Sequence, residues 1–144
     1  MTASEKEASE AAPAARLTAL RGNCMGAAVL LIVQFGLGVA VNLYVTLPKD
    51  KSFLAVVFGS AALAAHAIVA LLLLGAAIAA LVRAIRSGRA IVYTSVGLAA
   101  IIAAAFAGAS FVSKTSNGSS LTMALAAAVA TLSYLAAIFS LGDQ

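Results

Sequence analysis

The sequence predicts an all-α integral membrane protein in which four transmembrane helices form an up-down-up-down bundle. Hydrophobic residues make up 63% of the chain and charged residues only 10%, whereas soluble domains are about half apolar and about a quarter charged. The apolar residues form four long runs, each able to cross a hydrocarbon core of about 30 Å as a helix. The connectors between the runs are short, so consecutive helices should pack as antiparallel neighbours.

The four spans are predicted at residues 25–47, 53–82, 90–112 and 121–141, within a transmembrane domain of residues 23–144. Pro48 closes the first span, and the polar cluster around Asn117 marks a solvated turn before the fourth. The second span is longer than one crossing requires, so it should tilt or project at one end. Residues 1–22 are polar and Ala-rich, which predicts a disordered cytoplasmic tail and not a cleavable signal peptide.

Small residues recur at four-residue spacing along the predicted spans. The ladders include Ala99, Ala103 and Ala107, and Gly75 with Ala79. In lipid there is little hydrophobic attraction between helices, and small residues let the backbones approach closely. The ladders therefore predict small-residue packing within the bundle.

The basic residues predict the orientation of the chain in the membrane. One side holds five arginines: Arg16, Arg21, Arg83, Arg86 and Arg89. The other side holds three lysines: Lys49, Lys51 and Lys114. Cytoplasmic loops carry an excess of Lys and Arg, so the arginine side, with the basic loop of Arg83, Arg86 and Arg89 and both termini, is predicted to be cytoplasmic in a multi-pass cell-membrane protein. The net charge of +4 is explained by these flanks and requires no nucleic-acid partner.

Four polar side chains are expected to form a layer inside the membrane. Gln34, His66 and Tyr134 each lie thirteen residues from the outer end of their predicted span, which is about 20 Å at 1.5 Å per residue. Thr131 lies one turn outward of Tyr134 on the same helix face. A buried imidazole without partners is costly, and Gln34, Thr131 or Tyr134 would relieve that cost.

His66, the one histidine of the chain, has two interpretations. As a neutral side chain bonded to Gln34 or Tyr134, it would hold the helices in register. As a functional group, it would ligate a metal or haem, or relay protons. Asn42 and Tyr44, near the outer boundary, are interpreted as an interfacial anchor or as the lining of a small outer vestibule.

The stretch VQFGLGVAVNLYVTLP, followed by AAHAIVALLLLG, resembles one half of the haem A synthase type of membrane protein. Gln34, Leu37 and Gly38 match the first helix of that half, and His66 matches the ligand histidine of the second. The resemblance covers the first two spans and implies haem b as a cofactor with His66 as its ligand. The fourth span has no histidine where the family would place a partner ligand.

The residues favour a non-catalytic accessory, assembly or structural subunit of a membrane complex, or a homo-oligomer in the lipid bilayer. The spans contain no Asp, Glu, Lys or Arg, which disfavours a multidrug exporter because such four-helix proteins carry a glutamate in their first helix. No carboxylate accompanies His66 to orient it as a general base, so an enzyme is not predicted. Two alternatives remain: a b-type haem or quinone-linked electron carrier using His66, and a small channel or transporter lined by Gln34, His66 and Tyr134.

Overall fold

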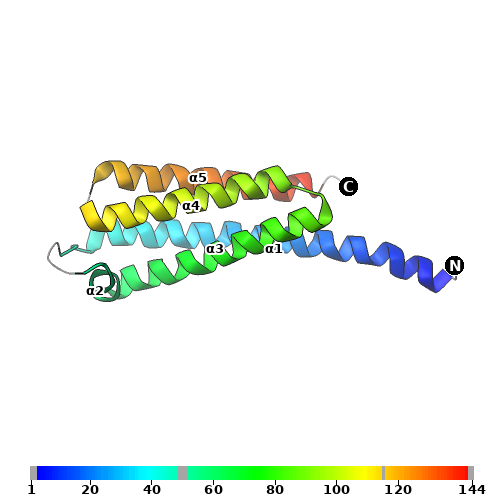
Figure 1. Cartoon of the computed structure of the whole chain (residues 1–144), viewed down its shortest axis with the longest axis horizontal. Coiled ribbons are helices and arrows are strands. Elements are labelled where there is room, and N and C mark those ends of the chain that lie inside the picture. Colours follow the sequence, from blue (N-terminus) through cyan, green and yellow to red (C-terminus); the bar gives the residue numbers. More distant parts are fainter. Residues whose placement is uncertain (1–2, 49–51, 115, 143–144) are drawn as a thin grey trace.

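The computed structural model describes residues 3–48, 52–114 and 116–142, with side chains from Pro13 onward. Four long helices form a bundle in which consecutive long helices run antiparallel, and one short helix lies across an end of the bundle (Figure 1). Their bounds are α1 Ala3–Tyr44, α2 Phe53–Phe58, α3 Ala61–Ser87, α4 Ile91–Lys114 and α5 Asn117–Ser140. The four long helices are long and apolar enough to cross a membrane. The predicted fold class is confirmed.

The helices pack in the order expected for an up-down-up-down bundle. α1 packs against α3 and α5, and α4 packs against the same two helices from the other side. Large apolar side chains such as Ile32, Leu71 and Phe106 are mostly exposed on the outside. A surface of this kind suits lipid, because a soluble protein rarely exposes such large apolar patches.

The predicted second span is not one helix. α2 ends at Phe58, Ser60 has extended backbone angles, and α3 begins at Ala61. Gly59 sits at the break, where a Cβ atom would lie only 2.7 Å from the Ala55 carbonyl oxygen. Glycine therefore permits the close backbone approach that ends α2, and α2 turns across the end of the bundle (Figure 1).

The structure also differs from the disordered tail expected at residues 1–22, because α1 is continuous from Ala3. The segment is rich in Ala and Glu, which are strong helix formers, and it extends the first span without a break. Pro13 lies inside this helix. Leu20 is already fully buried, and the part of α1 before the bundle projects beyond it (Figure 1).

Two core clusters hold the bundle together. The larger cluster contains fully buried alanines from three helices, namely Ala27, Ala77, Ala80, Ala84, Ala130 and Ala137. The smaller cluster packs α2 against the ends of α1 and α3 through Val41, Val56, Val57 and Leu63. The core between the long helices is built largely from small side chains, so their backbones lie close together.

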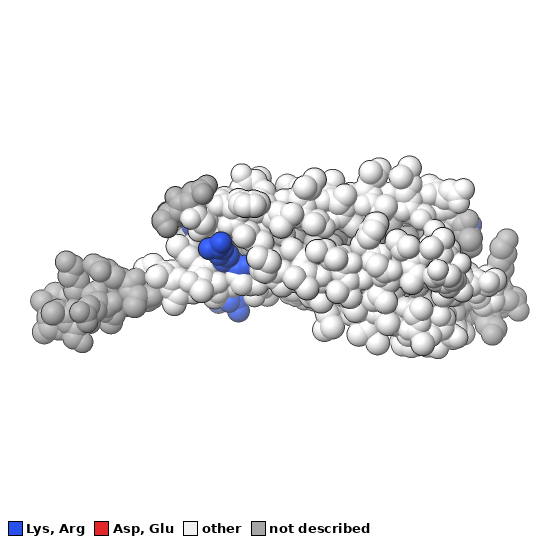
Figure 2. All heavy atoms as spheres, turned by 180° about the vertical axis from the view of Figure 1, so that it is seen from behind, with Lys and Arg blue, Asp and Glu red and all other residues white. Residues whose placement is uncertain are grey.

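The two ends of the bundle differ in charge. The exposed arginines lie at the end where α1 leaves the bundle, which we call the arginine end (Figure 2). Lys114 ends α4 at the opposite end, which we call the α2 end. Most of the surface between them in Figure 2 is uncharged. The molecule thus has the apolar belt and polar ends of a membrane-spanning bundle.

Candidate functional site

The structure brings Gln34 and His66 together across the α1–α3 interface. The Nε2 atoms of the two side chains are 3.1 Å apart, in a hydrogen bond. With the Gln34 amide in this orientation its N–H donates, so His66 accepts through Nε2 and carries its proton on Nδ1. The expected polar contact between the first two spans is therefore present.

Gly38 makes room for the imidazole ring. It lies one turn from Gln34 on the same face of α1. A Cβ atom at Gly38 would lie 3.2 Å from Cε1 of His66 and 3.8 Å from Nδ1. The His66 ring thus lies against the α1 backbone at Gly38. This contact and the hydrogen bond to Gln34 together fix the position of the ring along α1.

Two polar atoms of this pair have no hydrogen-bond partner among the described residues. Oε1 of Gln34 and Nδ1 of His66 are both buried. Leaving a buried polar atom unpaired costs about 1–3 kcal/mol. The pair therefore retains hydrogen-bonding capacity that the described part of the chain does not satisfy.

The hydrogen bond of this pair occupies one of the two His66 ring nitrogens, and Nδ1 has no partner among the described residues. His66 Nε2, one of the two nitrogens through which histidine binds metals, already contacts the Gln34 amide. Haem ligation through this atom would require the amide to move. Among the described residues, no three His, Cys, Asp or Glu side chains lie together as a metal site.

Tyr134 does not join the layer of Gln34 and His66. It is fully buried in the larger core cluster, which also contains Cys24. His66 lies five residues into α3 and Tyr134 seventeen residues into α5, and both helices begin at the α2 end, so the two side chains differ in depth by about 18 Å. The depth estimate failed because α5 begins at Asn117 instead of Leu121, and because α3 begins at Ala61 instead of Phe53.

The neighbours of Tyr134 and Thr131 are also different from those expected. The Tyr134 hydroxyl has no hydrogen-bond partner among the described residues. A Cβ atom at Gly97 would lie 2.8 Å from the Tyr134 ring, so α4 and α5 meet closely here. Thr131 donates to the Ala127 carbonyl of its own helix at 2.8 Å. Neither side chain is hydrogen-bonded to His66.

Asn42 and Tyr44 lie at the end of α1 and are both exposed, Tyr44 by 83%. A hollow of about 130 Å³ lies nearby, between residues 45–48 and residues 55–60. Neither Asn42 nor Tyr44 lines it. Their exposure agrees with the anchoring interpretation, and the residues that follow them line the hollow.

The basic loop is short and exposed. Arg83, Arg86 and Arg89 are all exposed around the α3–α4 turn. Gly88 closes α3 in the left-handed region, with φ of 66°, which glycine adopts without strain. Arg21 reaches the same end, since one of its guanidinium nitrogens lies 3.8 Å from the position of a Cβ on Gly142. The arginines thus gather at one end of the bundle.

Asn23 makes a second polar contact between α1 and α3 that the sequence analysis missed. Its Nδ2 atom donates to the Ala76 carbonyl oxygen at 3.1 Å. Asn23 lies beside the polar tail in the sequence, and only its position within a long helix shows that it faces α3. Together with the pair of Gln34 and His66, this bond holds α1 against α3.

The outward side of α1 carries three glycines that no contact within the described part of the chain explains. Gly22, Gly26 and Gly36 are exposed, and a Cβ atom on any of them would meet nothing within 4 Å. Val29 and Val33 lie between them, 52% and 46% exposed. We call these five residues the α1 glycine face. The four-residue spacing of Gly22 and Gly26 was the available sequence signal.

Comparisons with protein-family models, with curated proteins and with solved structures yield no match.

Proposed function

We propose that this chain is a non-catalytic accessory subunit of a membrane complex and docks through the α1 glycine face against another transmembrane helix. The proposal rests on the exposed glycines of that face. Glycine in a helix costs about 1 kcal/mol relative to alanine. Three such residues share one side of α1, where the described chain has no need of them.

The chemistry of the face suits helix–helix contact in lipid. Because lipid tails are as apolar as leucine, association depends on close packing, which glycines at four-residue spacing allow. Val29 and Val33 have stiff side chains that lose little entropy on packing. Elsewhere on the outside of α1 the exposed side chains are bulkier, as at Ile32 and Leu43.

The contacts between α1 and α3 support a structural role for the polar residues. Asn23 and the Gln34–His66 pair tie the two helices at two heights. Because these two contacts fix α1 against α3, they hold the α1 glycine face in one orientation on the bundle. Because Gln34 engages His66, the pair favours a structural interpretation over the haem and proton-relay alternatives.

The proposed setting is the cell membrane, with both termini cytoplasmic. The support is the gathering of five exposed arginines at the end of the bundle that holds both chain ends (Figure 1). Cysteine labelling from either side of sealed vesicles tests this orientation. A Ser113→Cys variant, in the last turn of α4, should react from outside.

The docking face is tested with two glycine variants and one measurement. Gly26→Leu places a bulky side chain on the face, and Gly75→Leu places the same side chain on the outside of α3, where a Cβ also meets nothing within 4 Å. The full-length protein is purified in a mild detergent and its assembly size is measured by native mass spectrometry. We expect wild type and Gly75→Leu to remain in a complex and Gly26→Leu to dissociate.

The same measurement identifies the partner, since the mass of the complex distinguishes a second copy of the chain from another protein. A Gly26→Leu variant that assembles like wild type contradicts the proposal. So does a wild-type protein that is monomeric in its native membrane.

A further inference from the structure

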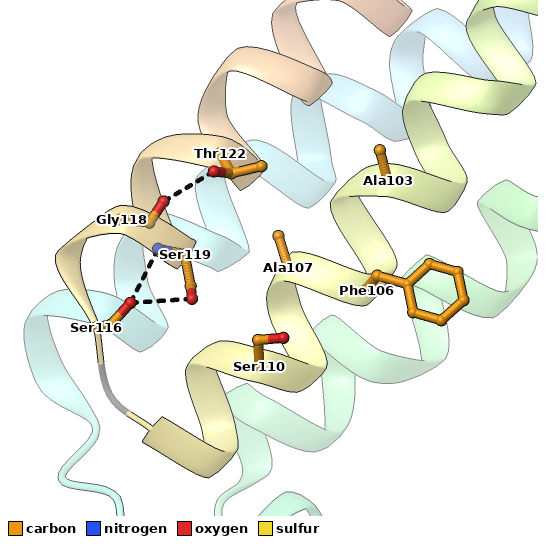
Figure 3. Close-up of a pocket in the computed structure, with 8 residues that line it drawn as sticks. All are labelled: Ala103, Phe106, Ala107, Ser110, Ser116, Gly118, Ser119 and Thr122. Carbon is orange, nitrogen blue, oxygen red and sulfur yellow. Dashed lines mark hydrogen bonds between the residues drawn. The ribbon is translucent and has the colours of Figure 1, made fainter.

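A hollow of about 570 Å³ lies between the outer part of α4 and the first turns of α5 (Figure 3). Ala103 and Ala107 of α4 line its deeper part and point toward α5. Ser110 of α4 and Ser119 and Thr122 of α5 line the part nearer the α2 end. The hollow is shallow and wide open, and the exposed Phe106 also lines it.

The polarity of the α4 wall changes along the helix. Ala103, Ala107, Ser110 and Lys114 follow one another at spacings of four, three and four residues, which places them on one helix face. Lys114 follows Ala103 by eleven residues, a rise of about 16 Å. Along this face the methyl groups of Ala103 and Ala107 and the Ser110 hydroxyl line the hollow, and Lys114 follows outside the lining, at the end of the helix.

The polar end of the hollow is positively polarised. α5 begins there, and its first turn carries the backbone N–H groups of Asn117 and Gly118, while Ser116 accepts from the N–H groups of Ser119 and Ser120. Helix N-termini favour anions, and Lys114 adds a full positive charge on the neighbouring helix. Neither α4 nor α5 carries a carboxylate. An anionic group would complement this end, and an apolar chain would complement the other.

We propose that the α4–α5 hollow binds one glycerophospholipid of the leaflet at the α2 end. An acyl chain lies along Ala103 and Ala107, and the phosphate lies beside Ser110, the first turn of α5 and Lys114. Free phosphate would leave the apolar part of the hollow empty. A transmembrane helix of a partner would also fit poorly, because it would place an apolar surface against the polar end of the hollow near Ser110 and Lys114.

The site is tested by adding lipids to the delipidated, full-length protein and counting bound molecules by native mass spectrometry. The probes are dioleoylphosphatidylglycerol, dioleoylglycerol, which has the same tails without phosphate, and inorganic phosphate. We expect one retained phosphatidylglycerol per chain, with dioleoylglycerol bound about tenfold more weakly. We expect no retention of inorganic phosphate.

Two variants and their matched controls localise the site. Ala103→Phe fills the apolar part, whereas Ala105→Phe adds the same ring at an exposed position on the opposite side of α4, outside the hollow. Lys114→Gln removes the positive charge, whereas Arg86→Gln removes one at the opposite end. We expect Ala103→Phe and Lys114→Gln each to weaken phosphatidylglycerol binding about tenfold, and both controls to match wild type.

Circular dichroism checks whether each variant folds. If Ala103→Phe does not fold, Lys114→Gln still tests the site, because it changes an exposed position. Equal phosphatidylglycerol binding by Ala103→Phe and Ala105→Phe would overturn the proposal. Equal binding of phosphatidylglycerol and dioleoylglycerol, retention of inorganic phosphate alone, or a dimer that only Ala103→Phe dissociates would also overturn it. Gly26 lies outside the hollow, so Gly26→Leu should leave phosphatidylglycerol binding unchanged. The lipid proposal and the docking proposal are therefore tested independently of each other.

Discussion

The Nε2 atoms of Gln34 and His66 lie 3.1 Å apart across the α1–α3 interface, and the His66 ring lies against the backbone at Gly38. This arrangement joins a hydrogen bond to a close steric contact. The bond selects which turn of α3 faces Gln34, and the contact with Gly38 limits how far the ring can move. Both features lead to measurable consequences.

Removing one partner of the pair should cost more than removing both. Gln34→Leu or His66→Leu alone leaves a buried polar atom facing an apolar side chain, and each should lower the free energy of unfolding by about 1–2 kcal/mol. The double variant should be closer to wild type than the sum of the single changes. Unfolding in mixed detergent micelles, arranged as a double-mutant cycle, measures the coupling. Simple additivity would mean that the bond contributes nothing.

Gly38 should tolerate a side chain less well than its neighbour Gly36. A Cβ at Gly38 would approach His66 Cε1 to 3.2 Å, whereas at Gly36 it meets nothing within 4 Å. Valine at either position has the same intrinsic helix propensity, so the difference isolates the contact with His66. We expect Gly38→Val to destabilise the isolated chain by about 1–3 kcal/mol more than Gly36→Val. Thermal unfolding of both variants tests this, and equal melting temperatures would refute it.

Gly97 should be required for the packing of Tyr134. Gly97→Ala would place a methyl group 2.8 Å from the Tyr134 ring, so one helix must shift. We expect a loss of about 1–3 kcal/mol relative to Gly75→Ala, which adds the same methyl group in open space. Tyr134→Phe should cost little, because the hydroxyl has no partner among the described residues. A Gly97→Ala variant as stable as Gly75→Ala would contradict the close α4–α5 contact.

The absorption spectrum separates the structural role of His66 from the haem alternative. If His66 is held by Gln34 as a structural group, the purified protein should be colourless and should gain no Soret band when haem b is added. The Gln34→Leu variant, which frees Nε2, provides the comparison. A Soret band in wild type that disappears in His66→Ala would show that His66 ligates haem.

The sequence alone determined the four apolar spans and the charge difference between their ends, and it made Gln34 one of three candidate partners for His66. Helix length follows from the thickness of the membrane, and both side chains lie in apolar runs where an unpaired polar group is costly. Depth along a span was therefore enough to place Gln34 among the candidates, and the structure selected it. Depth was not enough for Tyr134, because the break at Gly59 and the early start of α5 shift the helices along the bundle.

The tertiary structure alone decided which small residues are used inside the bundle and which remain outside. Gly38 and Gly97 each admit a ring from a neighbouring helix, whereas Gly22 and Gly26 face away from every described neighbour. In the sequence Gly26, Gly38 and Gly97 look alike, since all three lie in apolar runs. What distinguishes them is the rotation of each helix about its axis, which is set by contacts between residues far apart in the chain.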